Sequence, residues 1–177
     1  MVLRDAGYDV EVRTIGSRET YLPALISGEV DIVPEYVGTV TEFINKSENG
    51  ADAEAVASGD LDATVAALKV LGDQVGLEFG EASAAQDQNA FAVTAAFAAE
   101  YELETLSDLA NACPNISLGG PAECPDRPFC QPGLEETYGF DVVKFESYDV
   151  GGPLTKTAVK TGEVNVGLVF SSDGTLG

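Results

Sequence analysis

The chain has 177 residues, of which 30 are acidic and 9 are basic, and its formal net charge is −21. This charge excludes nucleic acid as a partner, because phosphate binding requires clustered lysine and arginine. The chain has no histidine, which excludes serine-histidine-aspartate and cysteine-histidine catalysis and imidazole metal sites, so we expect no metal and no cofactor.

The first half of the chain is predicted to contain both strands and helices. Ser17 and Asp60 are the expected N-caps of two helices, and Gly76 is the expected end of the second. Pro23 either kinks its helix or shifts the start so that Thr20 is the N-cap. Alternating apolar residues indicate strands. The predicted strands are residues 8–15, 30–33 and 77–79, and the predicted helices are residues 18–27, 38–44 and 61–75.

The second half continues the alternation of helices and strands. A segment rich in glycine, proline and cysteine, residues 119–132, interrupts it and is predicted to be a loop. Regular alternation of this kind indicates an α/β fold with mostly parallel strands. The predicted strands are residues 90–94, 115–118, 142–146 and 164–170, and the predicted helices are residues 95–101, 106–110, 134–138 and 155–160.

The cysteines indicate in which cellular compartment the protein resides. Cys124 and Cys130 flank the short sequence CPDRPFC, which lacks the spacing of a zinc knuckle, so a disulfide is the better interpretation. Such a bond implies an oxidising, extracytoplasmic environment. Cys113 is then either a buried thiol or the partner of a cysteine outside this chain. The N-terminal sequence MVLRDAGYDV lacks the basic and apolar regions of a signal peptide.

Two segments of the chain resemble each other. ALISGEVDIV, starting at Ala24, matches AVKTGEVNVG, starting at Ala158, and at the same offset Tyr36 corresponds to Phe170. Each segment is predicted to be a helix that ends at glycine and leads into a strand. The similarity reflects either a common helix-to-strand connector or two related walls of one ligand site, since ligands bind at the carboxyl ends of strands in open α/β sheets.

Several motifs are similar to those of one transport family. SGEVDIVPEYVGT, DQNAFAVT and GGPLTKTAVKTGEVNVGLVFSSDG resemble, in this order, sequences of the ABC importer binding proteins for glycine betaine, choline and related quaternary ammonium compounds. The resemblance covers nearly the whole chain. It implies a two-lobed, type II periplasmic-binding-protein-like α/β fold, truncated at both ends of lobe one. The implied division is a partial lobe one (1–91), lobe two (92–170) and the start of the return to lobe one (171–177).

The resemblance also implies a function and a mechanism. The chain is expected to be no enzyme but an extracytoplasmic, periplasmic or surface-anchored receptor, which delivers a quaternary ammonium osmolyte to a membrane permease. The two lobes would close on the ligand by hinge motion. A quaternary ammonium group donates no hydrogen bond, so proteins bind it with aromatic faces. Hydrogen-bond donors would hold the carboxylate or hydroxyl end of the ligand.

The residues of this cage are carried over from the family motifs. Tyr36 is the first aromatic wall, with Thr39 as a polar contact beside it. In this chain Phe occupies two positions that are often Tyr in the family, and the expected aromatic between residues 39 and 59 is represented only by Phe43. For each predicted residue a structural role in the core, a cap or the hinge is the alternative. The predicted ligand-binding residues are Tyr36, Thr39, Asn89, Phe91, Phe170 and Asp173.

Three other functions compete with this hypothesis. The first is a binding protein for another small polar solute, such as an amino acid. The second is an enzyme that uses paired carboxylates, for which Glu123 and Asp126 are the nearest candidates, inside the predicted loop. The third is a truncated fragment that binds nothing.

Overall fold

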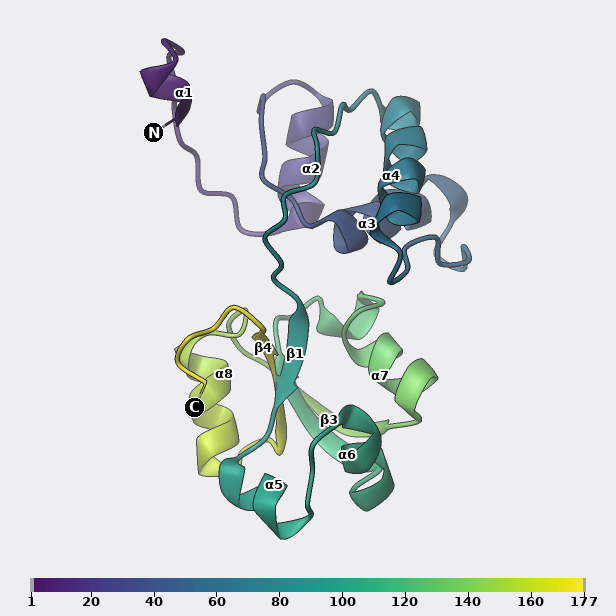
Figure 1. The fold of residues 1–177 in the computed structure, drawn as a ribbon, viewed down its shortest axis with the longest axis vertical. Coiled ribbons are helices and arrows are strands. Elements are labelled where there is room, and N and C mark those ends of the chain that lie inside the picture. Colours follow the sequence, from purple (N-terminus) through teal and green to yellow (C-terminus); the bar gives the residue numbers. More distant parts are fainter. Residues whose placement is uncertain (1, 177) are drawn as a thin grey trace. The chain divides into compact units, whose positions relative to one another are not determined.

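The computed structural model describes residues 2–176, which fall into two compact units, Met1–Gly80 and Glu81–Gly177. We call them the N-terminal unit and the C-terminal unit (Figure 1). Among the described residues, no helix combines the length and the apolar character that crossing a membrane would need.

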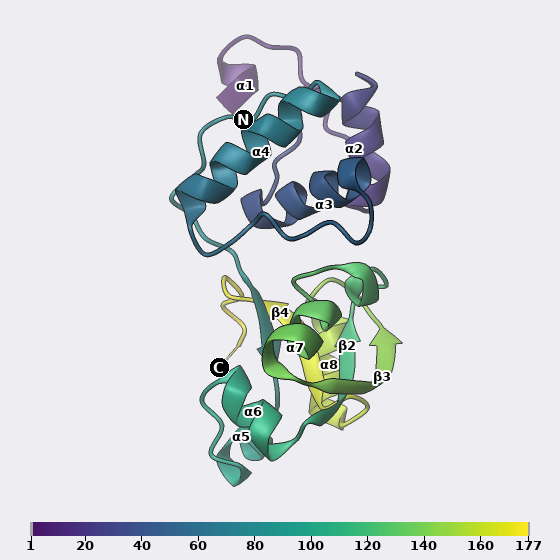
Figure 2. The same ribbon diagram turned by 90° about the vertical axis from the view of Figure 1, so that its right-hand side faces the viewer.

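The N-terminal unit is built from helices. Its core consists of apolar side chains of α2, α3 and α4, and α3 packs against α4 (Figure 2). These core residues recur at the spacing of one helix face. The helices are α1 (Val2–Asp5), α2 (Arg18–Ile26), α3 (Val37–Asn49) and α4 (Leu61–Val75), and the buried core residues are Leu22, Val40, Ile44, Leu68 and Leu71.

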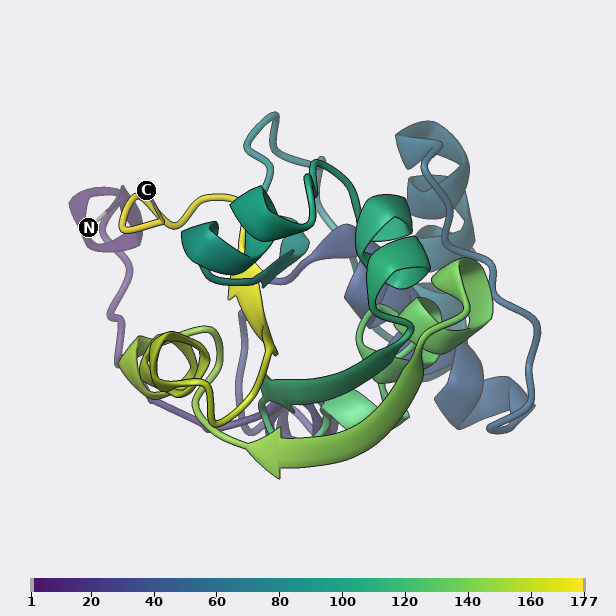
Figure 3. The ribbon, with the colours of Figure 1, turned by 90° about the horizontal axis from the view of Figure 1, so that it is seen from below.

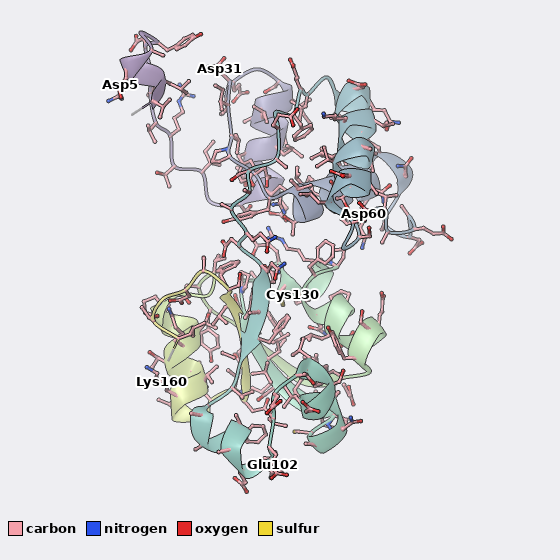
Figure 4. The ribbon with its side chains drawn as sticks, in the orientation of Figure 1. Asp5, Asp31, Asp60, Glu102, Cys130 and Lys160 are labelled. Carbon is pink, nitrogen blue, oxygen red and sulfur yellow. A yellow bond between two sulfur atoms is a disulfide. The ribbon has the colours of Figure 1, made fainter. Side chains whose placement is uncertain are left out.

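The predicted boundaries of α4 are confirmed. Asp60 accepts a hydrogen bond from the amide of Ala63 at 3.0 Å, and Gly76 ends the helix with a φ of 74° (Figure 4 labels Asp60). For α2, the helix starts at Arg18 and continues through Pro23 to Ile26. The proline therefore does not shift the start so that Thr20 is the N-cap.

Three predicted strands of the N-terminal unit are wrong. Residues 8–15, 30–33 and 77–79 form no strand in the structure, and the strands assigned within residues 2–176 all lie in the C-terminal unit. Alternating side chains favour an extended backbone, but a strand exists only where a second strand pairs with it. Several side chains of these segments stay exposed, including Tyr8, Val12 and Ile32.

A buried carboxylate holds the loop that follows α3. Glu42 is 1% exposed, and its Oε1 accepts hydrogen bonds from the amides of Val56 at 2.7 Å and Ala57 at 2.6 Å. Asn45, one turn further along α3, donates to the carbonyl of Glu54 at 2.9 Å. Two polar side chains of α3 thus fix this polar loop, which carries few apolar residues of its own.

The C-terminal unit is a four-stranded α/β structure. Its strands follow the order β1-β4-β2-β3, with β1 antiparallel to β4 and the other neighbours parallel. The four predicted strands of this half are confirmed, with ends that differ by at most two residues. They are β1 (Asn89–Ala92), β2 (Asn115–Gly120), β3 (Asp141–Ser147) and β4 (Val166–Phe170).

Helices cover both faces of this sheet (Figure 3). Alternate residues of β4 show the two sides: Val166 and Leu168 join the core cluster with residues of α6 and α7, whereas Gly167 faces α8. A Cβ at Gly167 would lie 2.6 Å from Cγ2 of Val159, so only glycine lets α8 approach so closely. The helices are α5 (Ala95–Glu100), α6 (Leu106–Ala112), the short η1 (Cys124–Asp126), α7 (Gln131–Tyr138) and α8 (Pro153–Thr161).

The two similar sequence segments have the same local structure after their helices. Gly28 and Gly162 have φ angles of 76° and 77°. The carbonyl oxygen of Ala24 accepts hydrogen bonds from the amides of residues 29 and 30 at 2.9 and 3.2 Å. The carbonyl oxygen of Ala158 accepts hydrogen bonds from the amides of residues 163 and 164 at 2.9 and 3.4 Å. The first segment leads into unpaired chain and the second into β4, so the likeness lies in the connector.

Candidate functional site

The predicted ligand residues of the N-terminal unit lie at the start of α3. Tyr36 is the N-cap residue of this helix, with extended backbone angles, and its side chain is half exposed. Thr39 lies in the first turn and is half-buried. Pro34 disfavours a helical conformation of the preceding residue. Tyr36 is still extended, and the helix begins directly after it.

A hydrogen-bonded ion pair contacts the backbone of Tyr36. The guanidinium of Arg18 donates from Nε and Nη2 to the two carboxylate oxygens of Glu35, both at 2.7 Å. The hydroxyl of Tyr21 donates to Glu35 at 2.6 Å, and the backbone amide of Tyr36 donates to the same carboxylate at 2.9 Å. The side chains of Arg18 and Glu35 are only 7% and 8% exposed, so this pair is largely shielded from water.

The environment shifts the pKa of each member of this cluster. Burial raises the pKa of Glu35, but hydrogen bonds from Arg18 and Tyr21 outweigh it, so the net pKa is lowered. Burial lowers the pKa of Arg18, and its hydrogen bond and attraction to Glu35 reverse this to a net rise. Burial and the hydrogen bond to Glu35 raise the pKa of Tyr21 to about 12. All three groups therefore keep their ordinary charge states at neutral pH.

Thr39 is linked to the same cluster. Its hydroxyl oxygen accepts a hydrogen bond from Nη2 of Arg18 at 2.8 Å, and its proton points toward the carbonyl of Tyr36 at 3.4 Å. Glu35 is not among the residues predicted from the sequence, because in a continued strand its side chain would point away from that of Tyr36. The structure has no strand there, and no sequence signal links Glu35 to Arg18, which lies 17 residues earlier in the chain.

The predicted ligand residues of the C-terminal unit lie on and after β1 and β4. Asn89 is directly opposite Phe170 in the antiparallel ladder, and Phe91 is opposite Leu168. Residues two apart on a strand, and residues directly opposite each other, share one face, so Asn89, Phe91 and Phe170 lie on the same face of this ladder. Phe170 ends β4 at the carboxyl edge of the parallel strands, whereas Phe91 also packs against the core.

Asn89 connects this edge of the sheet to the predicted loop. Its side-chain amide donates to the carbonyl of Phe129 at 2.8 Å. The neighbouring Cys130 forms the predicted disulfide with Cys124, which is therefore confirmed in the structure (Figure 4). Cys113 is half-buried, and its Sγ lies 3.2 Å from the carbonyl oxygen of Asn115.

Asp173 follows β4 and is held by hydrogen bonds within its own unit. Its carboxylate accepts from Nζ of Lys156, on α8, and from the amide and hydroxyl of Thr175 at 2.9 and 2.6 Å. These hydrogen bonds lower the pKa of Asp173 to about 2. The ligand role assigned to this residue stays a prediction, and these contacts describe a brace between α8 and residues 173–175.

Removing the disulfide gives a prediction about stability. The Cys124→Ser/Cys130→Ser variant is expected to be less stable by about 2 kcal/mol, because the bond closes a short loop and restricts the unfolded chain. Denaturant unfolding with and without reductant measures this difference. Cys113→Ser is the matched control and should keep the reductant sensitivity of the wild type, whereas the double variant should lose it. Wild-type stability unchanged by reductant would contradict the prediction.

Comparisons with known proteins agree with this architecture. A family model described as the substrate-binding domain of the ABC-type glycine betaine transport system matches residues 1–177. The chain is similar to the crystal structure of a glycine betaine/carnitine/choline ABC transporter protein, at 26% identity and a TM-score of 0.61. It is also similar to apo YehZ from Escherichia coli, at 26% identity and a TM-score of 0.52.

The matches cover a larger share of this chain than of the solved chains. The comparisons cover 98% of this chain but only 62% and 63% of the two solved chains. The fold is therefore the α/β fold of periplasmic-type binding proteins, of which this chain spans less than two thirds. The matching family consists of substrate-binding proteins and not of enzymes. The chain belongs to the family of substrate-binding domains of ABC-type glycine betaine transport systems.

Proposed function

We propose that the chain captures a quaternary ammonium osmolyte, such as glycine betaine or choline, outside the cytoplasm and delivers it to the permease of an ABC importer. It performs no reaction on the solute. The observation that carries the proposal is the half-exposed ring of Tyr36, 53% accessible, on a backbone fixed by a buried ion pair. An aromatic face held in place attracts a cation without needing a donor from it.

The other predicted residues are each proposed to contact the ligand. Phe91 and Phe170 contribute aromatic rings from one face of the β1–β4 ladder, and Asn89 lies beside them at its edge. Thr39 contributes a hydroxyl to the carboxylate or hydroxyl end of the ligand, and Asp173 braces the segment after β4. The Cys124–Cys130 disulfide supports an extracytoplasmic location, since such bonds persist in oxidising compartments.

The role of Tyr36 is tested by its replacement in the complete gene product. Tyr36→Ala is expected to weaken binding of glycine betaine or choline by about 2- to 30-fold, because one ring supplies about 0.5–2 kcal/mol to a bound cation. Tyr36→Phe is the matched control, which keeps the ring and should bind nearly as well as the wild type. Isothermal calorimetry measures both affinities.

The choice of ligand separates this proposal from its competitors. The tert-butyl analogue of choline has the same shape without the positive charge and should bind much more weakly. Equal binding of the two compounds would show a pocket that selects shape and not charge. Binding of an amino acid but of no quaternary amine would assign the chain to another polar solute. Absence of binding by the complete gene product to every quaternary amine would overturn the proposal.

A further inference from the structure

A single arginine contacts two residues of the predicted ligand motif PEYVGT in the N-terminal unit. Arg18 lies at the start of α2, yet its guanidinium contacts Glu35, which precedes α3, and Thr39, which lies in the first turn of α3. Seventeen and twenty-one residues separate Arg18 from these two partners in the sequence. The sequence motif therefore owes its local geometry to a residue outside it.

The second connection runs through the carboxylate to the backbone of Tyr36. Glu35 uses one oxygen for Nε of Arg18 and for the Tyr21 hydroxyl, and the other for Nη2 and for the amide of Tyr36. The planar guanidinium forms a two-pronged contact, which fixes the orientation of the carboxylate as well as its position. A carboxylate fixed in this way also fixes the amide that donates to it.

Stability alone is a weak reason for such a cluster. Apolar residues of similar volume commonly stabilise a protein as well as a buried ion pair does, because both charges lose their hydration. A two-pronged hydrogen-bonded pair fixes the orientation of the groups around it, which apolar packing does not. The residues oriented in this way, Tyr36 and Thr39, are the two predicted ligand contacts of this unit.

We propose that Arg18 is a positioning residue of the solute site, which holds Tyr36 and Thr39 in their ligand-binding arrangement through Glu35 and through its own contact with Thr39. The proposal rests on the proposed function, because it assigns Arg18 to the site to which Tyr36 belongs. Arg18 itself is buried behind the motif and acts through these residues.

The test compares the complete gene product with its Arg18→Lys variant. Lysine keeps the charge but replaces the planar fork with a single point of attachment, so it cannot orient Glu35 and Thr39 together. We expect the Kd for glycine betaine to rise about tenfold, by analogy with the lower end of the loss in affinity when residues that support metal ligands are removed. Circular dichroism establishes that the variant is folded under the conditions of the titration. Glu35→Gln is a second variant with the same expectation.

Two controls separate positioning from a general loss of stability. Thr64→Val removes a buried hydroxyl of α4 whose hydrogen bonds go to Ser58 and Asp60, so it weakens the same unit without touching the motif. It should lower the melting temperature and leave the Kd unchanged. In a Tyr36→Ala background, the effect of Arg18→Lys on the Kd should be smaller than in the wild type, because only the part that acts through Thr39 remains.

The outcomes are distinct. A folded Arg18→Lys variant that binds like the wild type overturns the assignment while the proposed function stands. The same follows if Thr64→Val weakens binding equally, or if the effects of Arg18→Lys and Tyr36→Ala simply add. A wild-type protein that binds no quaternary amine overturns the proposed function and the assignment with it.

Discussion

Replacing Glu35 by alanine is expected to lower the free energy of unfolding by about 3–5 kcal/mol, because the change leaves the buried Arg18 cation without its partner. The hydroxyl of Tyr21 and the amide of Tyr36 lose an acceptor in the same step. Chemical denaturation of the wild type and the variant at neutral pH measures the difference. The predicted loss is several times larger than that for an exposed ion pair.

The Glu35 contribution should also depend on pH. The pKa of Glu35 is lowered in the folded protein, so its contribution is fully present above the ordinary glutamate pKa of about 4.3. It is lost as the pH falls through the lower, folded-state pKa, because protonation then favours the unfolded chain. The stability difference between wild type and Glu35→Ala should therefore shrink in acid and stay constant around neutral pH.

A double variant provides the control for this prediction. Arg18→Met/Glu35→Met removes both charges and keeps apolar volume, so it should be much more stable than Glu35→Ala. A single variant as stable as the wild type would show that Arg18 is solvated and that the pair is not buried as described. A double variant as unstable as the single one would point to lost packing and not to an unpaired charge.

Replacing Glu42 by alanine is expected to cost about 3 kcal/mol, because two backbone amides then lose a charged acceptor. The expected consequence is local as well as global. The segment that contains Val56 and Ala57 should become open to proteolysis and to amide hydrogen exchange, since its own side chains bury little apolar area. Hydrogen exchange followed by mass spectrometry measures both effects.

Glu42→Gln is the matched variant, because its carbonyl oxygen still accepts hydrogen bonds from the two amides. It should lose clearly less stability than Glu42→Ala and should keep residues 50–58 protected. Equal losses in the two variants would assign the effect to the charge and not to the hydrogen bonds. Protection of this loop unchanged in Glu42→Ala would contradict the anchoring role.

The sequence predicts the C-terminal unit well because its signals are complete within the chain. The four strands have partners there, and the structure shows a capping box between Thr105 and Asp108 at the start of one of the helices between them. In the N-terminal unit the same alternation at residues 8–15, 30–33 and 77–79 predicted strands that the structure lacks. Side-chain alternation is a local property, whereas pairing depends on a second segment that no local pattern reveals.

The candidate site was predictable in its motif residues but not in their support. Tyr36 and Thr39 follow from the sequence PEYVGT, and the pairing of Cys124 with Cys130 follows from their spacing. Arg18 was treated only as a helix residue, and no periodicity relates it to Glu35. Long-range ion pairs of this kind depend on how α2 packs beside α3, which is decided by core residues such as Leu22.

The repeated connector has a further consequence for how the molecule unfolds. At Gly28 and Gly162 the backbone angle is nearly identical, and an added Cβ would have nothing within 4 Å. Alanine at either position therefore introduces the same conformational strain, about 1 kcal/mol, without any collision. One position lies in each unit, so Gly28→Ala and Gly162→Ala are equally destabilising substitutions in the two units. If the two units unfold as one cooperative system, both substitutions lower the temperature of the same unfolding transition. If they unfold independently, each substitution lowers only the transition of its own unit.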